Sequence, residues 1–201
     1  MLKPGRRIIL TVLLAFLLVV MGALVYVFEG RRMFGAVIEP PKPMPDFTLM
    51  AEHGPVSLSQ FKGKMVLIYF GYTNCPDICP TTLGSLAQAL SLLSEKEASQ
   101  VQVIFISVDP QRDTPEKLGG YARMFYPTFV GLTGTREQLD AITRSYGITY
   151  RLKEPDAKGY YVVEHSTSIL ALDRNGNLAA LWSFGQQASE IASDLKNLLR
   201  R

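Results

Sequence analysis

The chain has few of the residues that build cross-links and metal sites, with two cysteines, two histidines and one tryptophan among 201 residues. Both cysteines lie in one short segment, as Cys75 and Cys79. A disulfide between them would close a loop too small to remove much entropy from the unfolded chain. A structural disulfide framework is therefore a poor explanation, and a reactive or metal-binding pair is the better interpretation.

Most of the chain has no excess of basic over acidic residues. The net charge is +3, but residues 1–33 hold five basic residues and one acidic residue, which leaves 16 basic against 17 acidic residues in the remainder. A nearly neutral remainder offers no surface for nucleic acid, so we predict no nucleic-acid partner. The length and the 47% of hydrophobic residues fit one globular domain with a sizeable core.

One long apolar run stands out, because residues 8–28 contain no charged side chain. At about 1.5 Å per residue such a helix is roughly 31 Å long, which matches the hydrocarbon core of a bilayer. A cleaved secretory signal is the alternative, but its apolar region is usually shorter, about 7–15 residues. We predict a basic N-terminal tail at 1–7 and an uncleaved transmembrane signal-anchor at 8–28.

The charges around this run favour an N-terminus on the inner side, by three basic residues before it against two after it. The cysteine pair suits an oxidising compartment. We therefore expect a single-pass protein of the inner, cytoplasmic membrane with its domain on the periplasmic side. Residues 29–45 contain four closely spaced prolines and are predicted to form an extended, semi-rigid linker before a domain at 46–201.

The remaining sequence alternates strand and helix patterns. Residues 46–49 and 56–58 flank a turn and predict a hairpin. The continuous apolar runs 65–70 and 101–108 are typical of central strands covered on both faces. Further periodicities predict helices at 76–97, 115–125, 136–146 and 188–199 and strands at 129–132, 160–164, 168–172 and 178–184. This order predicts an α/β, thioredoxin-like fold in which helices flank a mixed central sheet.

The segment GYTNCPDICP, residues 71–80, lies where the first central strand meets the first predicted helix. Proline suits the first helical position, so we expect Pro76 to begin the helix and Cys75 to cap it, where free amides stabilise a thiolate. Cys79 then lies about one turn further on the same face. The two sulfurs fit either two ligands of one metal or a redox pair that forms a disulfide, whereas burial as inert apolar residues fits less well.

A third, imidazole ligand can come only from His53 or His165. His53 lies in a polar turn, where we expect it to be solvated. His165 precedes the strand at 168–172, and in a thioredoxin-like architecture that loop faces the cysteine pair. His165 would complete a site with Cys75 and Cys79. From its position in the sequence alone, a structural histidine held by hydrogen bonds is an equally good interpretation. Two soft thiolates with an imidazole favour copper or zinc.

Several segments together carry a resemblance to a known family. They are DFTL at 46–49, FKGK at 61–64, GYTNCPDICP at 71–80, SVDPQRDTP at 107–115 and VEHST at 163–167. On these motifs the chain resembles the Sco/SenC family, copper chaperones that assist the assembly of cytochrome c oxidase. The combination of the two longest motifs is specific, and a single N-terminal span is also usual in that family.

The resemblance implies a thioredoxin-like domain that binds copper, as Cu(I) or Cu(II), through Cys75, Cys79 and His165. It also implies copper delivery to, or thiol reduction of, the copper A site of cytochrome c oxidase subunit II or another copper-site protein. The motifs do not separate these two activities, because both need the same two sulfurs. Asp109 ends the second central strand and is a candidate for tuning the metal or docking, with strand termination an equal explanation.

Other classes of protein use similar cysteines. A thiol–disulfide oxidoreductase without metal is the main alternative, and an inert membrane-tethered module is disfavoured by the intact cysteine pair. A peroxiredoxin-type peroxidase needs Thr three residues and Pro seven residues before its reactive cysteine. The chain has Pro76 and Tyr72 at those positions before Cys79, and Tyr72 and Ile68 before Cys75, so fast peroxide turnover is not expected. We predict a metallochaperone rather than an enzyme, with thiol–disulfide reductase activity as the alternative.

Overall fold

The computed structural model describes residues 12–22 and 33–200, and the chain divides into two units, Met1–Met33 and Phe34–Arg201. In the first unit, residues 12–22 form a helix with exposed side chains. Within the described parts of the chain, no helix is both long enough and apolar enough to cross a membrane. The predicted span at 8–28 lies partly outside the described residues, and the basic tail at 1–7 lies wholly outside them.

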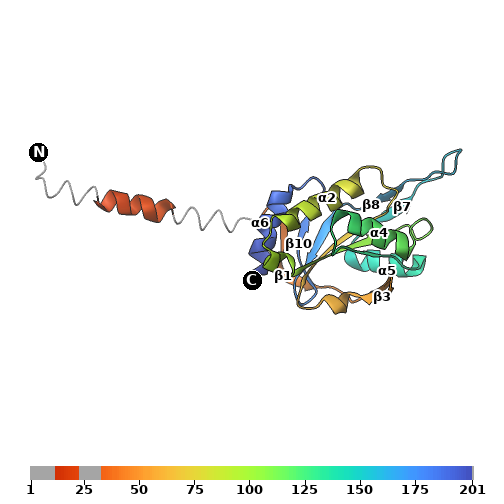
Figure 1. Ribbon diagram of the computed structural model, residues 1–201, viewed down its shortest axis with the longest axis horizontal. Coiled ribbons are helices and arrows are strands. Elements are labelled where there is room, and N and C mark those ends of the chain that lie inside the picture. The colour runs from red at the N-terminus through yellow and green to blue at the C-terminus, as the bar shows by residue number, and fades with distance from the viewer. Residues whose placement is uncertain (1–11, 23–32, 201) are drawn as a thin grey trace, which may run out of the picture. The chain divides into compact units, whose positions relative to one another are not determined.

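A mixed sheet forms the centre of the second unit, with the strand order β1-β10-β9-β4-β5-β6 (Figure 1). Its strands are β1 (Ala36–Pro43), β4 (Met65–Gly71), β5 (Val101–Ser107), β6 (Val130–Leu132), β9 (Ile169–Leu172) and β10 (Asn177–Trp182). β4, β5 and β6 are parallel, whereas β9, β10 and β1 follow in antiparallel order. Every residue of β4 and β5 is buried, as their continuous apolar runs predict.

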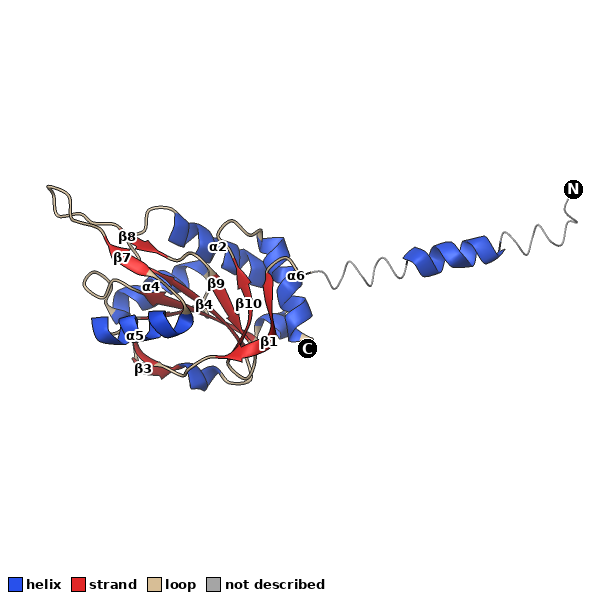
Figure 2. Ribbon diagram, turned by 180° about the vertical axis from the view of Figure 1, so that it is seen from behind, coloured by secondary structure: helices blue, strands red, loops and turns tan. Residues whose placement is uncertain are grey.

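Helices cover both faces of this sheet (Figure 2). They are the 3-10 turn η1 (Leu58–Phe61) and the helices α2 (Ile78–Ser91), α3 (Glu95–Ala98), α4 (Pro115–Phe125), α5 (Arg136–Tyr146) and α6 (Ala188–Leu199). Neighbouring residues of a strand point to opposite faces, so Tyr69 reaches Cys79 of α2 whereas Phe70 contacts Tyr146 of α5. α6 packs beside α2. The predicted thioredoxin-like α/β architecture of this unit is confirmed.

The helix predicted at 76–97 is two helices in the structure. α2 ends at Ser91, and Ser94 begins α3 with a capping box, in which its side chain accepts the amide of Glu97 and the Glu97 side chain accepts the Ser94 amide. A serine and a glutamate three residues apart are a helix-start signal, and the leucine periodicity that runs up to it concealed this signal. The other predicted helices have the bounds that the sequence indicated.

Two short hairpins lie outside the central sheet. β2 (Thr48–Ala51) pairs with β3 (Gly54–Ser57) as predicted. β7 (Tyr150–Leu152), which the sequence did not predict, pairs with β8 (Val163–His165). The connection between β7 and β8 extends away from the body of the domain in both views (Figures 1 and 2). The predicted strand at 160–164 is thus displaced toward His165 and belongs to this hairpin.

The prediction of a spacer over residues 29–45 was wrong for its second half. There the chain forms β1, which pairs antiparallel with β10, and the register shifts between Val37 and Lys42 where two prolines intervene. Prolines lack an amide donor, so a sheet accepts them only at an edge or a bulge, and β1 is an edge strand. A proline-rich segment therefore did not mean a free linker.

The entry to the domain is fixed by a buried carboxylate on α6. Asp194 is fully buried and accepts the amides of Phe34 (3.0 Å) and Gly35 (2.8 Å) and the indole N–H of Trp182 (2.8 Å). A Cβ atom at Gly35 would lie 2.6 Å from the Trp182 ring, so glycine is required for this close approach. The folded unit begins at Phe34, twelve residues before the predicted Asp46.

Candidate metal centre

The two cysteines lie on either side of the start of α2. β4 ends at Gly71, residues 72–77 form a loop, here called the Cys loop, and α2 begins at Ile78. Cys75 is partly buried in the loop, and Cys79 is buried in the first turn of the helix. The predictions that Pro76 begins the helix and that Cys75 caps it were both wrong by two residues, because the N-cap residue is Asp77. An amide at the start of the helix still stabilises a Cys75 thiolate, because the N–H of Cys79 points at the Cys75 sulfur at 3.4 Å.

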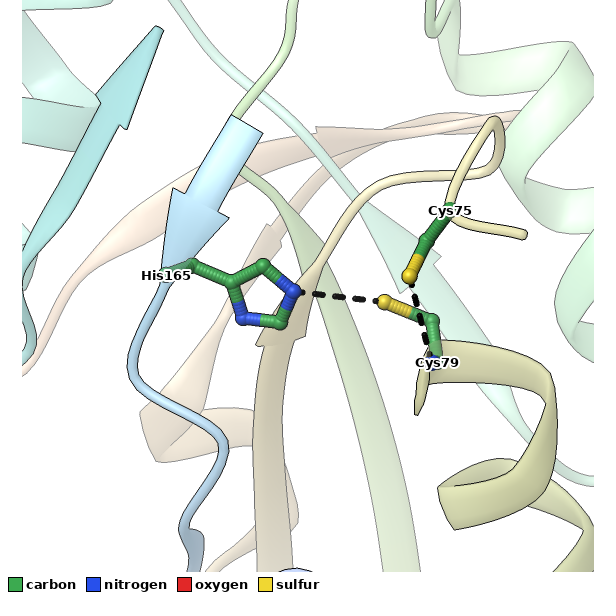
Figure 3. Close-up of side chains that lie close together, drawn as sticks. All are labelled: Cys75, Cys79 and His165. Atoms are coloured by element: carbon green, nitrogen blue, oxygen red, sulfur yellow. Dashed lines mark hydrogen bonds between the residues drawn. The ribbon is translucent and has the colours of Figure 1, made fainter. Parts of the chain in front are cut away.

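His165 is the last residue of β8 and comes to the cysteines from the far end of the sequence. Its Nε2 lies 3.5 Å from the Cys79 sulfur, and its Nδ1 lies 2.9 Å from the carbonyl oxygen of Ser166 (Figure 3). A carbonyl oxygen can only accept, so Nδ1 carries a hydrogen, and in the neutral imidazole Nε2 then has the lone pair that faces the site. This is the usual arrangement of a metal-binding histidine.

The three side chains form one cluster. Sγ of Cys75, Sγ of Cys79 and Nε2 of His165 all lie within 4.8 Å of one another, and Figure 3 shows both sulfurs beside the edge of the imidazole. Metal bonds of about 2.3 Å to sulfur and about 2.0 Å to nitrogen bring ligands to roughly 4 Å from one another. The donors therefore need a shift of about 1 Å to share one ion, within the reach of side-chain rotation.

The two thiols differ strongly in acidity. The Cys79 thiol donates a hydrogen bond toward the Cys75 sulfur, and with the amides of Cys79 and Asp77 this lowers the pKa of Cys75 to about 5, against the opposing effect of burial. That hydrogen bond and burial raise the pKa of Cys79 far above its usual value. In the metal-free protein Cys75 is thus a thiolate at neutral pH and Cys79 a thiol.

Two tyrosines complete the walls of the site. Both rings meet the imidazole of His165 edge-on, Tyr69 at 6.1 Å and Tyr72 at 5.9 Å between centroids. The Tyr69 hydroxyl lies 3.8 Å from the Cys79 sulfur, and burial raises the pKa of Tyr72 to about 12. The sequence prediction missed both residues. For Tyr69 the alternation of side chains along β4 was the available signal, because Tyr69 lies two residues before Gly71, which also faces Cys79.

Asp109 and His53 contribute no ligand to this cluster. Asp109 is fully buried, but its carboxylate pairs with Arg112 and accepts the Tyr161 hydroxyl at 2.8 Å. The His53 side chain is 87% exposed in the β2–β3 turn, as expected. Within residues 12–22 and 33–200, the group of Cys75, Cys79 and His165 is the one cluster of three that could hold a metal ion.

A thioredoxin-like α/β domain with a Cys–Cys–His cluster at the start of its first long helix defines a narrow class of metal or redox proteins. The SCO1/SenC family model matches residues 36–200 of this chain, including all three members of the cluster. The chain therefore belongs to the SCO1/SenC family.

Relatives of similar sequence support this family assignment. A mitochondrial SCO2 homologue of Bos taurus is 38% identical over 153 residues, which is 75% of this chain and 58% of the bovine protein, so the matched segment spans less than two thirds of that relative. A SCO2-like protein of Rickettsia felis is 36% identical over 153 residues, 75% of this chain and 74% of that protein.

Solved structures share the fold and include metal-bound forms. The apo Sco1 protein of Thermus thermophilus has a TM-score of 0.77 and 39% identity, covering 84% of this chain and 98% of its own. The ScoI protein of Bradyrhizobium japonicum, solved with copper bound, has a TM-score of 0.70 and 35% identity, covering 78% of this chain and 99% of its own.

Proposed function

We propose that this protein is a copper chaperone that binds copper through Cys75, Cys79 and His165. The observation that carries the proposal is the convergence of two sulfurs and the Nε2 atom of His165 within 4.8 Å. Sulfur and imidazole donors are typical ligands of copper, and copper is bound in the relative from Bradyrhizobium japonicum. The ion is cargo rather than a resident cofactor, in the form of Cu(I) or Cu(II).

The arrangement suits capture and release. Cys75 is a thiolate before metal arrives, so it is the first sulfur to bind, and binding then displaces the proton of Cys79. Three protein donors leave a coordination position open to an incoming thiolate of a partner, as in metal sites that exchange ligands, and Cys75 and His165 are partly exposed whereas Cys79 is buried. Following the family, we propose the copper A site of cytochrome c oxidase subunit II, or another copper-site protein, as the recipient.

Copper titration of the wild type and of Cys75→Ser, Cys79→Ser and His165→Ala tests this function. We expect about one Cu(I) per chain in the wild type, a loss of more than about 100-fold in affinity for each cysteine variant, and a smaller loss for His165→Ala. His53→Ala is the matched control, because its imidazole is exposed and outside the cluster, and it should bind as the wild type does. Unchanged affinity in His165→Ala would contradict the three-ligand site.

Thiol–disulfide exchange is a second candidate function, favoured by the opposite pKa shifts of the two thiols. A low-pKa Cys75 attacks one sulfur of a partner disulfide, and the partner's other sulfur leaves as a thiolate. Cys79, deprotonated, then attacks the mixed disulfide, which forms a Cys75–Cys79 disulfide and releases the reduced partner. Exchange with an oxidised copper A domain, abolished by Cys75→Ser but retained by His165→Ala, would identify this reaction.

We also propose that residues 8–28 anchor the domain to a membrane, after a basic tail at 1–7, with the domain on the periplasmic side. The support is the uncharged run of 21 residues. Extraction of membranes with alkaline carbonate should leave the full chain in the pellet, and deletion of residues 1–28 should release it. A full chain found in the supernatant, or cleaved near residue 28, would contradict the anchor.

A further inference from the structure

The VDPQRDTP motif at residues 108–115 contains none of the three candidate ligands, yet it buries two carboxylates. Asp109 and Asp113 are both 0% exposed. Acidic side chains are almost never fully buried unless they are paired and hydrogen-bonded. The partners of these two carboxylates include Thr73, on the segment that carries the cysteines, and Tyr161, on the segment that carries the histidine.

Asp113 holds the Cys loop. Its carboxylate accepts the amide of Thr73 at 2.8 Å and also the Thr73 hydroxyl. Lys117 lies 3.0 Å from the same carboxylate and donates to the side chain of Asn74 at 2.9 Å. These contacts fix the two residues that directly precede Cys75, so the sulfur side of the site has a rigid base.

Arg112, the preceding residue, holds the other side. The β7–β8 hairpin, residues 150–165, is here called the His hairpin, and it contains Tyr161 four residues before His165. The Arg112 guanidinium lies 3.6 Å from the centre of the Tyr161 ring, and its Nη1 donates to the Tyr161 carbonyl oxygen at 2.9 Å. Its Nε pairs with Asp109, which also accepts the Tyr161 hydroxyl. A planar guanidinium can stack and donate at once, which lysine cannot do.

Arg112 also reaches the Cys loop through Tyr72. The guanidinium lies 5.5 Å from the centre of the Tyr72 ring, and that ring meets His165 edge-on at 5.9 Å. One side chain thus contacts both the His hairpin and the Cys loop, and Tyr72 fills the space between the guanidinium and the imidazole.

The His hairpin needs such an external contact. Its paired strands have only three residues each, and an isolated two-stranded hairpin is marginally stable in water. Arg136 fixes its base, since Nη1 bonds the Tyr150 hydroxyl at 3.0 Å and the Val108 carbonyl at 3.1 Å. Loss of Arg112 would therefore loosen the half of the hairpin that leads to His165 without detaching the whole.

We propose that Arg112 is a positioning residue of the copper site, which holds the His hairpin against the Cys loop so that His165 Nε2 reaches the two sulfurs. This inference rests on the proposed copper-binding function. One feature argues against a role in stability alone. Nη2 of Arg112 is buried and has no hydrogen-bond partner among the described residues. A buried unpaired donor lowers the free energy of unfolding, which is not expected of a residue that only stabilises the fold.

The test compares Arg112→Gln with Arg123→Gln, a matched loss of an arginine that pairs with Glu52 away from the site. In Arg112→Gln we expect Cu(I) affinity to fall by about 10–100-fold, the usual effect of removing a group that orients a metal ligand. The paramagnetic resonance spectrum of the Cu(II) form should lose its imidazole nitrogen coupling. Arg123→Gln should change neither. Tyr161→Phe keeps the ring but loses the hydroxyl, so its effect should be smaller.

A double variant separates positioning from a general loss of structure. If Arg112 acts through the imidazole, Arg112→Gln with His165→Ala should bind copper no more weakly than His165→Ala alone. Additive losses, or nitrogen coupling that is unchanged in Arg112→Gln, would overturn the proposal. Chemical denaturation of the same variants shows that each one folds.

A measurement without copper keeps this inference distinct from the proposed function. Hydrogen exchange of the metal-free protein should show faster exchange at the amides of the His hairpin in Arg112→Gln, with the Cys loop unchanged. Absence of copper binding by the wild type would contradict the chaperone function, but the hydrogen-exchange result would still show whether Arg112 holds the hairpin. Unaltered exchange in the hairpin would refute the positioning role whatever the copper result.

Discussion

The Cys loop and the His hairpin supply the two halves of one site, but they are built differently. The Cys loop continues a fully buried central strand and is fixed by the buried carboxylate of Asp113. The His hairpin extends from the body of the domain, and its exposed charges include the ion pair of Lys153 and Glu164. Segments with few buried contacts open at lower free-energy cost than core strands. The sulfurs therefore have a fixed position, whereas the position of the imidazole is adjustable.

The largest loss of stability is expected for a variant that removes the anchor of the Cys loop. Asp113→Ala removes a fully buried acceptor and leaves the ammonium of Lys117 without its carboxylate partner. Breaking a buried ion pair by removing one partner costs about 3–5 kcal/mol, discounted toward the lower end because Lys117 is 44% exposed. Urea denaturation of the metal-free protein measures this loss. A change below about 1 kcal/mol would remove the distinction between a fixed loop and an adjustable hairpin.

A second effect concerns the reactivity of the cysteines. With a pKa of about 5, Cys75 of the metal-free, reduced protein remains a thiolate as the pH falls from 8 to 6 and is protonated only near pH 5. The rate of its alkylation by iodoacetamide should therefore be half-maximal near pH 5, against about 8.5 for an ordinary cysteine. Buried Cys79 should react far more slowly. Mass spectrometry of the modified peptides separates the two.

The variant Cys79→Ala checks the cause of this shift. The hydrogen bond from Cys79 is the largest contribution to the low pKa of Cys75, and an alanine side chain has no donor to replace it. The midpoint of the Cys75 alkylation profile should move to higher pH in this variant. A midpoint that stays near pH 5 would assign the shift to the backbone amides instead.

A smaller effect is expected at Gly71, where the Cys loop leaves β4. A Cβ atom there would lie 2.7 Å from the Cys79 sulfur and 2.8 Å from the Phe105 ring. Gly71→Ala should destabilise the fold by about 1–3 kcal/mol through overpacking, and it should weaken copper binding by displacing Cys79. Gly84→Ala, on the same helix as Cys79 but with open space around it, should stabilise by about 0.5–1 kcal/mol. Equal unfolding midpoints for the two variants would contradict this packing.

The smallest effect is expected on the His hairpin. Glu164→Gln removes an ion pair with Lys153 whose side chains are 57% and 47% exposed. Exposed pairs contribute about 0.2–1 kcal/mol, so the unfolding free energy should change by less than about 1 kcal/mol and copper affinity should be retained. A loss as large as that of Asp113→Ala would show that the hairpin is as firmly anchored as the loop.

Local patterns were enough for much of this molecule. Continuous apolar runs predicted the buried strands β4 and β5, and periodicity predicted α4, α5 and α6, because these signals depend on residues close together in the chain. The two cysteines were assigned a reactive or metal-binding role from their spacing and the strand-to-helix junction. The errors lie where distant segments decide, such as β1, whose prolines are accommodated only because β10 leaves an edge for them.

By itself, the sequence determined the α/β class of the domain, the position of the cysteine pair at the start of the first long helix, and the family through its motifs. Tertiary structure decided that His165 meets the sulfurs, because 86 residues separate it from Cys79 and no local rule brings them together. It also decided the difference between the two thiols, since burial and a shared hydrogen bond set their pKa values. The position of Arg112 between the Cys loop and the His hairpin is likewise a property of the folded chain alone.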